Sequence, residues 1–259
     1  MMSDPALHVN VLGTKIAAVD MEAAVDLIDT WISQKDTGHY VCVSGVHGVM
    51  ESQRNPEIRA AHNGASACVP DGMPMTWVGR FCGHRSMNRV YGPDLMLRML
   101  ELSAERGYTN FFYGGAEGVA DDLKTRMEHR FQGLEIIGTF CPPFRPLSSE
   151  EKGRVISDLN RLKPDLLWVG LSTPKQERFM AEFHEELSVK VMIGVGAAFD
   201  FHTGRVRQAP RWMMRAGLEW LFRLCMEPMR LGPRYLRNNP AFIWNILAQY
   251  AGLRKYPID

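Results

Sequence analysis

Residues 189–195 read VKVMIGV, an apolar run of strand length that lacks the polar alternation of a half-buried strand. Runs of this kind are typical of strands covered on both faces, as in parallel sheets flanked by helices. We expect a strand over Lys190–Val195. Six further strands are expected over His8–Ile16, His39–Val46, Ala67–Pro70, Asn110–Tyr113, Leu134–Thr139 and Asp165–Leu171.

Amphipathic helical patterns separate these runs. They cover Asp20–Gln34, Pro56–Asn63, Pro93–Arg106, Gly118–Phe131, Ser149–Leu162 and Pro174–Leu187. The alternation predicts an α/β fold with a mainly parallel, Rossmann-like sheet and helices on both faces. In such sheets, ligands bind beyond the carboxyl ends of the strands. The loops at those ends are therefore where functional residues are expected.

The bulk composition is that of an ordinary globular protein, with 46% hydrophobic and 23% charged residues in 259. No apolar run approaches the ~20 residues that span a bilayer, and MMSDPALHVN does not read as a signal peptide. The five cysteines include no CxxC pair, which favours reduced thiols. We expect a cytoplasmic protein.

The C-terminal part differs in character from the rest. Residues 211–237 read RWMMRAGLEWLFRLCMEPMRLGPRYLR, and from Arg205 to Arg237 eight arginines face two glutamates. Because the whole chain sums to only +1, the remainder is net acidic. We expect an α/β catalytic domain over residues 1–204 and a basic, amphipathic helical appendage over 205–259. The appendage suits a membrane surface or a phosphate-bearing ligand; packing on the body or on a second subunit is the alternative.

Two strand-end loops suggest chemistry. The loop VPDGMP places Asp71 directly after a short strand, where a carboxylate can act as a general base or can simply form an Asp-Gly turn. The stretch FFYGGAEGVADDL runs from a strand through Gly114 and Gly115 into a helix. Backbone N–H groups at such a helix start suit a phosphate, although a tight strand–helix turn would look the same.

Two later loops add polar residues at the same expected edge. VGLSTPKQE supplies Lys175 and Gln176, which could contact a phosphate and a base edge or could be a solvated helix start. IGVGAAFDFHTG supplies Asp200, which would suit a sugar hydroxyl or bond its own loop. The sequence has no Asp-x-Asp, HExxH or Cys/His set with metal spacing, so we expect no metal site. Arginines would then neutralise a diphosphate.

Together these loops resemble the WecG/TagA/CpsF glycosyltransferase family. The similar stretches, from about residue 40 to 237, are VPDGMP, RVYGPDL, YGGAEGVA, GLSTPKQE, GVGAAFDFHTG and QAPRWMMRAGLEWLFRLCMEP. The resemblance implies a metal-independent, inverting enzyme without a cofactor. Its partners would be a UDP-sugar donor and a polyprenyl-diphosphate-linked sugar acceptor at the cytoplasmic membrane face, in cell-surface polysaccharide synthesis.

Carried over to this sequence, the resemblance makes Asp71 the catalytic base. It assigns contacts with the UDP-sugar to Arg89, Gln176 and Asp200, and it places Arg223 and Arg230 of the appendage at the active site. Arg234 matches the family pattern less closely.

One stretch departs from the family. The family often carries Thr-x-Asn on the strand before PDG, which would fall on Val43 and Gly45, but this chain reads VSGVHG. Ser44 and His47 are the neighbouring polar residues that could substitute as substrate contacts. A different donor sugar is the other reading, so the sequence does not identify the sugar.

Two other classes of protein are alternatives to a glycosyltransferase. A doubly wound sheet also suits an NAD(P)-dependent oxidoreductase, but GxGxxG and the ribose-binding acid are missing. A non-enzymatic membrane- or RNA-binding module would explain the basic segment and leave the polar loops unexplained. No RNA motif occurs, so no nucleic-acid partner is expected. The apolar appendage could also support a homo-oligomer.

Overall fold

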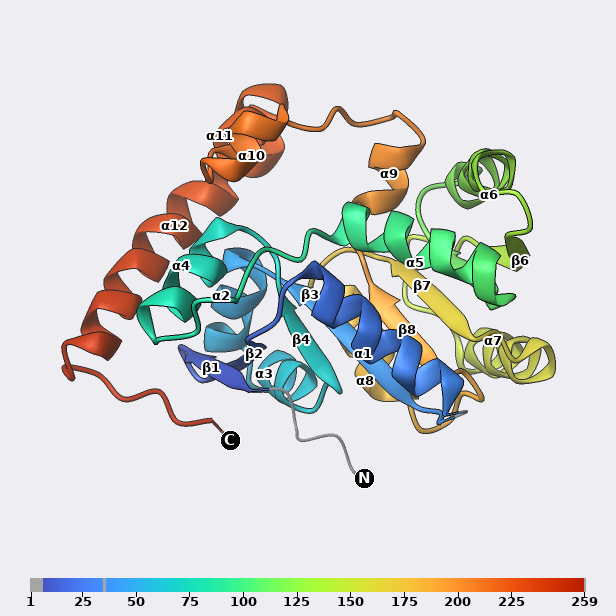
Figure 1. The fold of residues 1–259 in the computed structure, drawn as a ribbon, viewed down its shortest axis with the longest axis horizontal. Coiled ribbons are helices and arrows are strands. Elements are labelled where there is room, and N and C mark those ends of the chain that lie inside the picture. Colours follow the sequence, from blue (N-terminus) through green and yellow to red (C-terminus); the bar gives the residue numbers. More distant parts are fainter. Residues whose placement is uncertain (1–6, 35, 259) are drawn as a thin grey trace. The chain divides into compact units, whose positions relative to one another are not determined.

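The computed structural model describes residues 7–34 and 36–258 (Figure 1). Strands and helices alternate along most of this length, as expected. In chain order they are β1 (His8–Val11), β2 (Thr14–Ala17), α1 (Met21–Ser33), β3 (His39–Ser44), α2 (Val46–Arg54), α3 (Pro56–Asn63), β4 (Ala67–Pro70), α4 (Met73–Phe81), α5 (Gly92–Arg106), β5 (Thr109–Gly114), α6 (Val119–Arg130), β6 (Glu135–Phe140), α7 (Ser149–Leu162), β7 (Leu166–Gly170), α8 (Lys175–Phe183), β8 (Val191–Gly194), α9 (Ala198–His202), α10 (Arg211–Arg215), α11 (Glu219–Met226) and α12 (Pro228–Tyr250).

A six-stranded sheet with the order β4-β3-β8-β7-β5-β6 forms the centre of the fold. The pairings of β3 with β8, β8 with β7, β7 with β5 and β5 with β6 are all parallel. The expected α/β class with a parallel, Rossmann-like sheet and a helical C-terminal segment is therefore confirmed. Chain neighbours such as β5 and β6 pair directly, and each parallel connection passes through a helix.

The expected single strand over His8–Ile16 is wrong. The segment forms the antiparallel hairpin β1–β2, a separate two-stranded sheet, in which Val11 pairs with Thr14. Leu12 and Gly13 have φ angles of 52° and 77°, and this left-handed backbone reverses the chain. Likewise, the strand expected over His39–Val46 ends at Ser44, because Val46 already begins α2.

Contacts divide the chain into two compact units. Unit 1 contains residues 1–21, 43–91 and 207–259, and unit 2 contains residues 22–42 and 92–206. Strand β3 begins in unit 2 and ends in unit 1. The expected division at residue 204 remains a prediction, but residues 207–259 belong to the same compact unit as the loop that carries Asp71.

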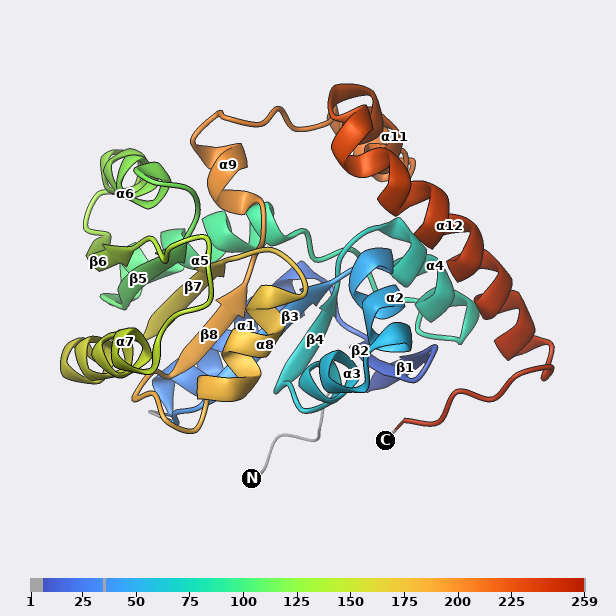
Figure 2. The same ribbon diagram turned by 180° about the vertical axis from the view of Figure 1, so that it is seen from behind.

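In unit 2, helices cover both faces of the sheet. Figures 1 and 2, which view the molecule from opposite sides, show α1 and α5 on one face and α7 and α8 on the other. Strand β7 is the centre of the core, with Trp168 fully buried. The Trp168 indole N–H donates to Oδ1 of Asn110 on β5 at 2.9 Å, so the one polar atom of this large side chain is satisfied.

In unit 1, the long helix α12 has two different faces. Leu231, Asn238, Phe242 and Ala248 are buried, at the spacing of one helical stripe. The opposite stripe exposes large apolar side chains, Met229, Leu236, Ile243, Leu247 and Tyr250. Helix α12 packs along α2 and, through a ring contact of Tyr250 with Phe81 at 5.2 Å, along α4 (Figure 1).

Candidate active site

Asp71 lies immediately after the buried strand β4, at its carboxyl end. Its backbone N–H donates to the Ser44 carbonyl at 2.8 Å, and the Val90 N–H donates to the neighbouring Pro70 carbonyl at 2.8 Å. A Cβ at Gly45 would lie 2.7 Å from the Asp71 carbonyl oxygen, so only glycine allows this approach. The backbone of Asp71 is thus held from two sides, while its side chain remains 34% exposed to solvent.

Arg89 forms an ion pair with Asp71 in unit 1. Its Nη2 atom lies 3.4 Å from Asp71 Oδ1 and 2.5 Å from Oε2 of Glu219, the first residue of α11. Its guanidinium stacks 4.1 Å from the centroid of the Tyr91 ring. The Arg89 Nε is buried and lacks a hydrogen-bond acceptor in the described structure. Arg89 therefore links the strand-end loop to the C-terminal segment.

The electrostatics of this cluster favour a proton acceptor at Asp71. Burial raises the pKa of the Asp71 carboxyl, Arg89 lowers it, and Glu219 raises it again, leaving the pKa above the ordinary value for aspartate. A carboxylate with a raised pKa is a better base than a freely solvated one. Burial, together with Glu219 and Asp71, also raises the pKa of Tyr91, which keeps that phenol neutral.

A cluster of arginines from α11 and α12 accompanies these residues. Burial lowers the pKa of Arg234, and the charges of Arg230 and Arg223 lower it further, as happens when cations are held close together. The Arg230 Nε donates to Glu227 Oε2 at 2.5 Å, and this bond lowers the pKa of Glu227. Of these arginines, Arg223 acts electrostatically on Asp71 and lowers the pKa of its carboxyl.

The two residues expected to replace the family's Thr-x-Asn have different surroundings. Ser44 is buried, and its hydroxyl contacts Nε2 of His62 at 3.1 Å, whereas its backbone carbonyl accepts the Asp71 N–H. His47 lies on α2, where its Nδ1 is 3.1 Å from Nδ2 of the buried Asn238 on α12. His47 thus connects α2 to the C-terminal helix. Substrate contact by either residue remains a prediction.

In unit 2, the glycine loop follows β5. Gly114 has a φ of 121°, and a Cβ there would lie 2.6 Å from the Gly170 carbonyl oxygen. Gly115 donates its N–H to the same carbonyl at 3.0 Å. These contacts alone explain why glycine is needed here. Helix α6 carries Asp121 and Asp122 in its first turn, and these acids oppose an anion at its start. Phosphate contact by Gly114 and Gly115 remains a prediction.

Gln176 is buried at the start of α8 and its amide is fixed in orientation. Its Oε1 accepts the Gly196 N–H at 3.0 Å, and its Nε2 donates to Glu177 Oε1 at 3.2 Å. Thr173 donates to the same Glu177 oxygen at 2.8 Å. The structure therefore joins the loops after β7 and β8 through Gln176, within unit 2.

The other two residues expected in unit 2 are more accessible. Lys175 is exposed, with its Nζ 4.5 Å from the centroid of the Phe144 ring. Asp200 lies on the short helix α9 beside the buried Phe199, and its carbonyl accepts the Val206 N–H at 3.2 Å. Helix α9 was not expected from the sequence. Their contacts with a donor remain predictions.

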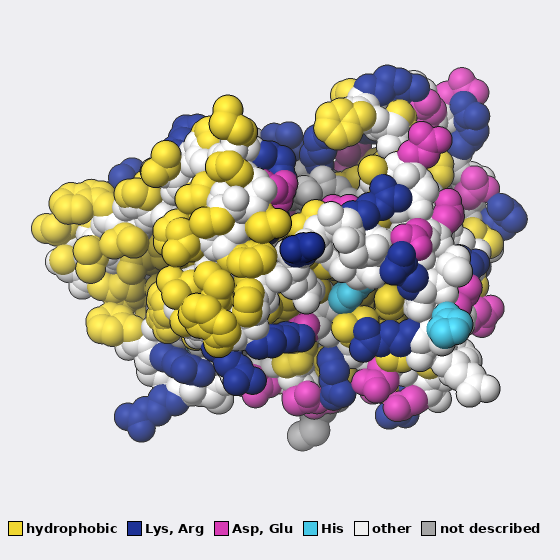
Figure 3. Space-filling view, turned by 90° about the horizontal axis from the view of Figure 1, so that it is seen from above, with side chains coloured by type: hydrophobic (Ala, Val, Ile, Leu, Met, Phe, Trp, Pro, Cys, Tyr) yellow, Lys and Arg dark blue, Asp and Glu magenta, His cyan; other side chains and the backbone are white. Residues whose placement is uncertain are grey.

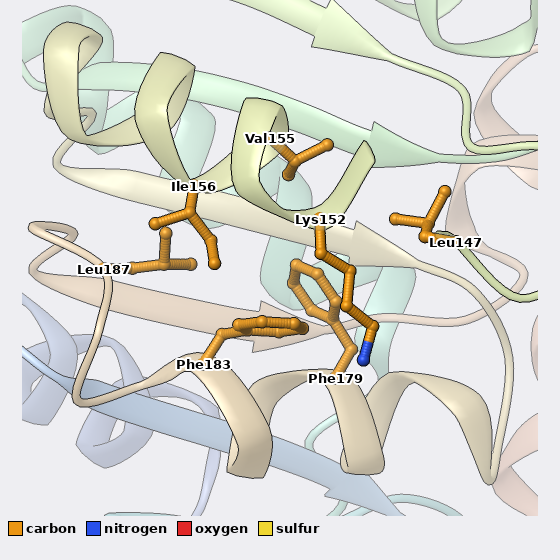
Figure 4. A pocket seen from close by; sticks show the side chains of 7 residues that line it. All are labelled: Leu147, Lys152, Val155, Ile156, Phe179, Phe183 and Leu187. Carbon is orange, nitrogen blue, oxygen red and sulfur yellow. The ribbon is translucent and has the colours of Figure 1, made fainter. Parts of the chain in front are cut away.

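A small pocket between α7 and α8 of unit 2 is lined by Leu147, Lys152, Val155, Ile156, Phe179, Phe183 and Leu187 (Figure 4). Its one charged side chain, Lys152, is bound to Glu182 at 2.6 Å. The pocket therefore offers no set of reactive groups. Within residues 7–34 and 36–258, no three His, Cys, Asp or Glu residues are grouped so as to hold a metal ion.

Sequence reasoning missed three residues of the unit 1 cluster. Glu219, Tyr91 and Tyr235 are drawn into it by tertiary packing, and the Tyr235 ring lies 6.0 Å from that of Trp220. One signal was available for Glu219, because it is one of only two acids among the arginines of the C-terminal segment.

Comparison with known proteins identifies the class to which this site belongs. Residues 9–256 match the model of the glycosyl transferase WecG/TagA/CpsF family, so the chain belongs to that family and is a glycosyltransferase. The resemblance noted from the loops is confirmed.

Two curated relatives make the similarity more specific. Both are named N-acetylglucosaminyldiphosphoundecaprenol N-acetyl-beta-D-mannosaminyltransferase. The protein from Bacillus spizizenii strain W23 is 26% identical over 88% of this chain and 86% of its own length. The protein from Bacillus subtilis strain 168 is 27% identical over 71% of this chain and 73% of its own length. A nicotinamide-dependent oxidoreductase and a non-enzymatic module are set aside on this basis.

Proposed function

We propose that this protein transfers a hexosyl or N-acetylhexosaminyl group from a UDP-sugar to a sugar carried on polyprenyl diphosphate, with inversion and without a metal ion. The observation that carries the proposal is the Asp71–Arg89–Glu219 cluster at the carboxyl end of β4. The names of the two relatives support a lipid-diphosphate-linked N-acetylglucosamine acceptor and a β-linked product.

In the proposed reaction, the Asp71 carboxylate takes the proton from an acceptor hydroxyl. The acceptor oxygen forms a bond to the anomeric carbon as the bond from that carbon to the UDP oxygen breaks. UDP leaves with the electron pair, and Asp71 later returns its proton to solvent. A single displacement of this kind converts an α-linked donor into a β-linked product. The raised pKa of Asp71 supports its role as the base.

The departing UDP gains negative charge, and arginines are the groups proposed to stabilise it. Arg89 lies beside the proposed base, and Arg223, Arg230 and Arg234 are concentrated on α11 and α12. Guanidinium groups match pairs of phosphate oxygens and retain their charge at all physiological pH values. In the proposed reaction, these arginines take the place of a divalent metal ion in stabilising the diphosphate.

Unit 1 is further proposed to dock on the membrane that carries the acceptor. Figure 3 shows apolar side chains gathered over the C-terminal helices and α4 of unit 1, with basic side chains at their margin. The exposed apolar residues, here called the apolar surface, are Trp77, Phe81, Trp212, Trp220, Leu221, Met226, Met229, Leu236, Ile243, Trp244, Leu247, Tyr250 and Leu253. No helix in the described residues is long and apolar enough to cross a bilayer. Surface docking is the mode that fits.

The test is UDP release from a panel of UDP-sugars, with UDP-N-acetylmannosamine included, in the presence of a short-chain polyprenyl-diphosphate N-acetylglucosamine and EDTA. Release that depends on both donor and acceptor and survives chelation supports the proposal. Loss of release on chelation contradicts the metal-free mechanism. Absence of release with every donor contradicts the proposed donor class.

The assignment of the base is tested separately with Asp71→Asn. We expect turnover to fall by roughly 10²–10⁴-fold while UDP binding is kept, because the amide cannot accept the proton. Asp158→Asn is the matched control, since Asp158 forms only an exposed ion pair with Arg161 on α7. Equal turnover in Asp71→Asn and wild type would remove Asp71 from the mechanism.

A further inference from the structure

Glu219 belongs to the cluster around Asp71, but the reaction described above assigns it no step, although it contacts Arg89 more closely than Asp71 does. The Arg89 Nη2 is 2.5 Å from Glu219 Oε2 and 3.4 Å from Asp71 Oδ1. The side chain of Glu219 is 15% exposed and that of Arg89 is 12% exposed. Holding a mostly buried, ionised carboxylate beside a proposed base costs free energy unless a cation pairs with it. The guanidinium thus bonds Glu219 more closely than Asp71.

We propose that Glu219 is a positioning residue for the transfer reaction: it holds Arg89 and offsets its charge, so that Asp71 stays a competent base. This inference rests on the proposed function of Asp71. Without Glu219, the whole charge of Arg89 would act on Asp71 and stabilise its ionised form, and a carboxylate stabilised in this way is a weaker proton acceptor.

The charged and titratable groups around Asp71 come from three segments. The loop before α5 contributes Arg89 and Tyr91, α11 contributes Glu219 and Arg223, and α12 contributes Tyr235, whose environment includes Glu219 and Arg223. With Asp71 ionised, the two carboxylates balance the two guanidinium groups. Removing the charge of Glu219 leaves Asp71 facing an excess of positive charge. The effect on Asp71 therefore has a definite sign.

The magnitude follows from the shared contact. The Asp71 and Glu219 carboxylates both contact the same Arg89 nitrogen, so their oxygens lie within about 6 Å of each other. At an effective dielectric constant of about 20, the repulsion between two unit charges at this distance corresponds to roughly two pK units. Solvent screening at the partly exposed Asp71 reduces this to about one unit.

The experiment measures the pH dependence of kcat/KM and kcat for wild type, Glu219→Gln, Glu219→Asp and Asp71→Asn. In Glu219→Gln we expect the acid limb to move to lower pH by about one unit and kcat to fall about 10-fold. Glu219→Asp retains the charge, so its acid limb should stay nearer to that of wild type. Glu101→Gln is the control, because Glu101 pairs with Arg98 on the exposed side of α5. Thermal melts show that each variant is folded.

The outcomes separate the inference from the proposed function. If Glu219→Gln keeps the wild-type profile while Asp71→Asn is inactive, the inference is overturned and the base assignment stands. A loss of kcat with an unmoved acid limb makes Glu219 merely structural and also overturns it. A rise in turnover would also overturn the inference, because Glu219 would then compete with the diphosphate for Arg89. If Asp71→Asn is fully active, the base assignment and this inference fail together.

Discussion

Replacing Trp244 by alanine should weaken binding to anionic membranes and leave the fold intact. Trp244 is 69% exposed on α12, next to Ile243 and near Leu247 on the apolar surface. A tryptophan has up to about 250 Å² to bury, so about 170 Å² is available to lipid here. If half of this area enters the interface, about 2 kcal/mol is lost, or roughly 30-fold in affinity.

The assay is co-sedimentation with phosphatidylcholine–phosphatidylglycerol vesicles at several salt concentrations. Phe144→Ala is the matched control, since Phe144 is 98% exposed but lies in unit 2, outside the apolar surface. Thermal melts should change little because the side chain is on the surface. Equal weakening by Phe144→Ala, or none by Trp244→Ala, would refute docking through this surface. Sedimentation velocity would show whether a second copy of the chain covers it instead.

The remaining predictions concern pH and the backbone. Burial raises the pKa of Asp71, and the ionised form is the active one. As the pH is lowered, kcat/KM should therefore begin to fall at a higher pH than an ordinary aspartate would give. A pH–rate profile that is flat through the acid range would contradict this. Gly114→Ala should lower the free energy of unfolding by about 2–4 kcal/mol, because the φ of 121° and the Gly170 carbonyl exclude a Cβ at this position. Denaturant titration measures this loss. The control Gly153→Ala should lose little stability, because a Cβ there meets nothing within 4 Å. The Arg145 hydrogen bond lowers the pKa of Glu151 to about 2, so this group stabilises the fold above its unfolded pKa and the gain is lost as pH falls. Melting temperatures of Glu151→Gln and wild type should therefore differ at neutral pH and converge near pH 2; a constant difference would refute the linkage.

Local patterns predicted most of the sheet correctly. The runs that became β4, β5, β7 and β8 were expected within a few residues, because a strand buried on both faces must be continuously apolar. The hairpin at Leu12 and Gly13 was missed because the residues on both sides of the turn are apolar and read as one strand. Helices α2 and α4 were missed because each is short and follows a strand without a clear cap.

The site was predictable to the extent that its residues stand at strand ends. Asp71 and Gln176 were singled out because each follows a strand, and ligands of parallel sheets bind beyond the carboxyl ends of the strands; their contacts with substrate stay predictions. Sequence could not show that Gly196 fixes the Gln176 amide, since this contact joins the loop after β8 to the start of α8, 20 residues apart along the chain.

The sequence by itself determined the α/β class, the positions of the polar loops, the basic character of the C-terminal segment and the family. Tertiary structure alone decided that Glu219 meets Arg89 across 130 residues of chain, and that the exposed stripe of α12 lies beside the apolar side chains of α4. The physical reason is that periodicity and turn chemistry act between near neighbours in sequence. The charge balance around Asp71 depends instead on distances of a few ångströms, which only the packing of α11 and α12 sets.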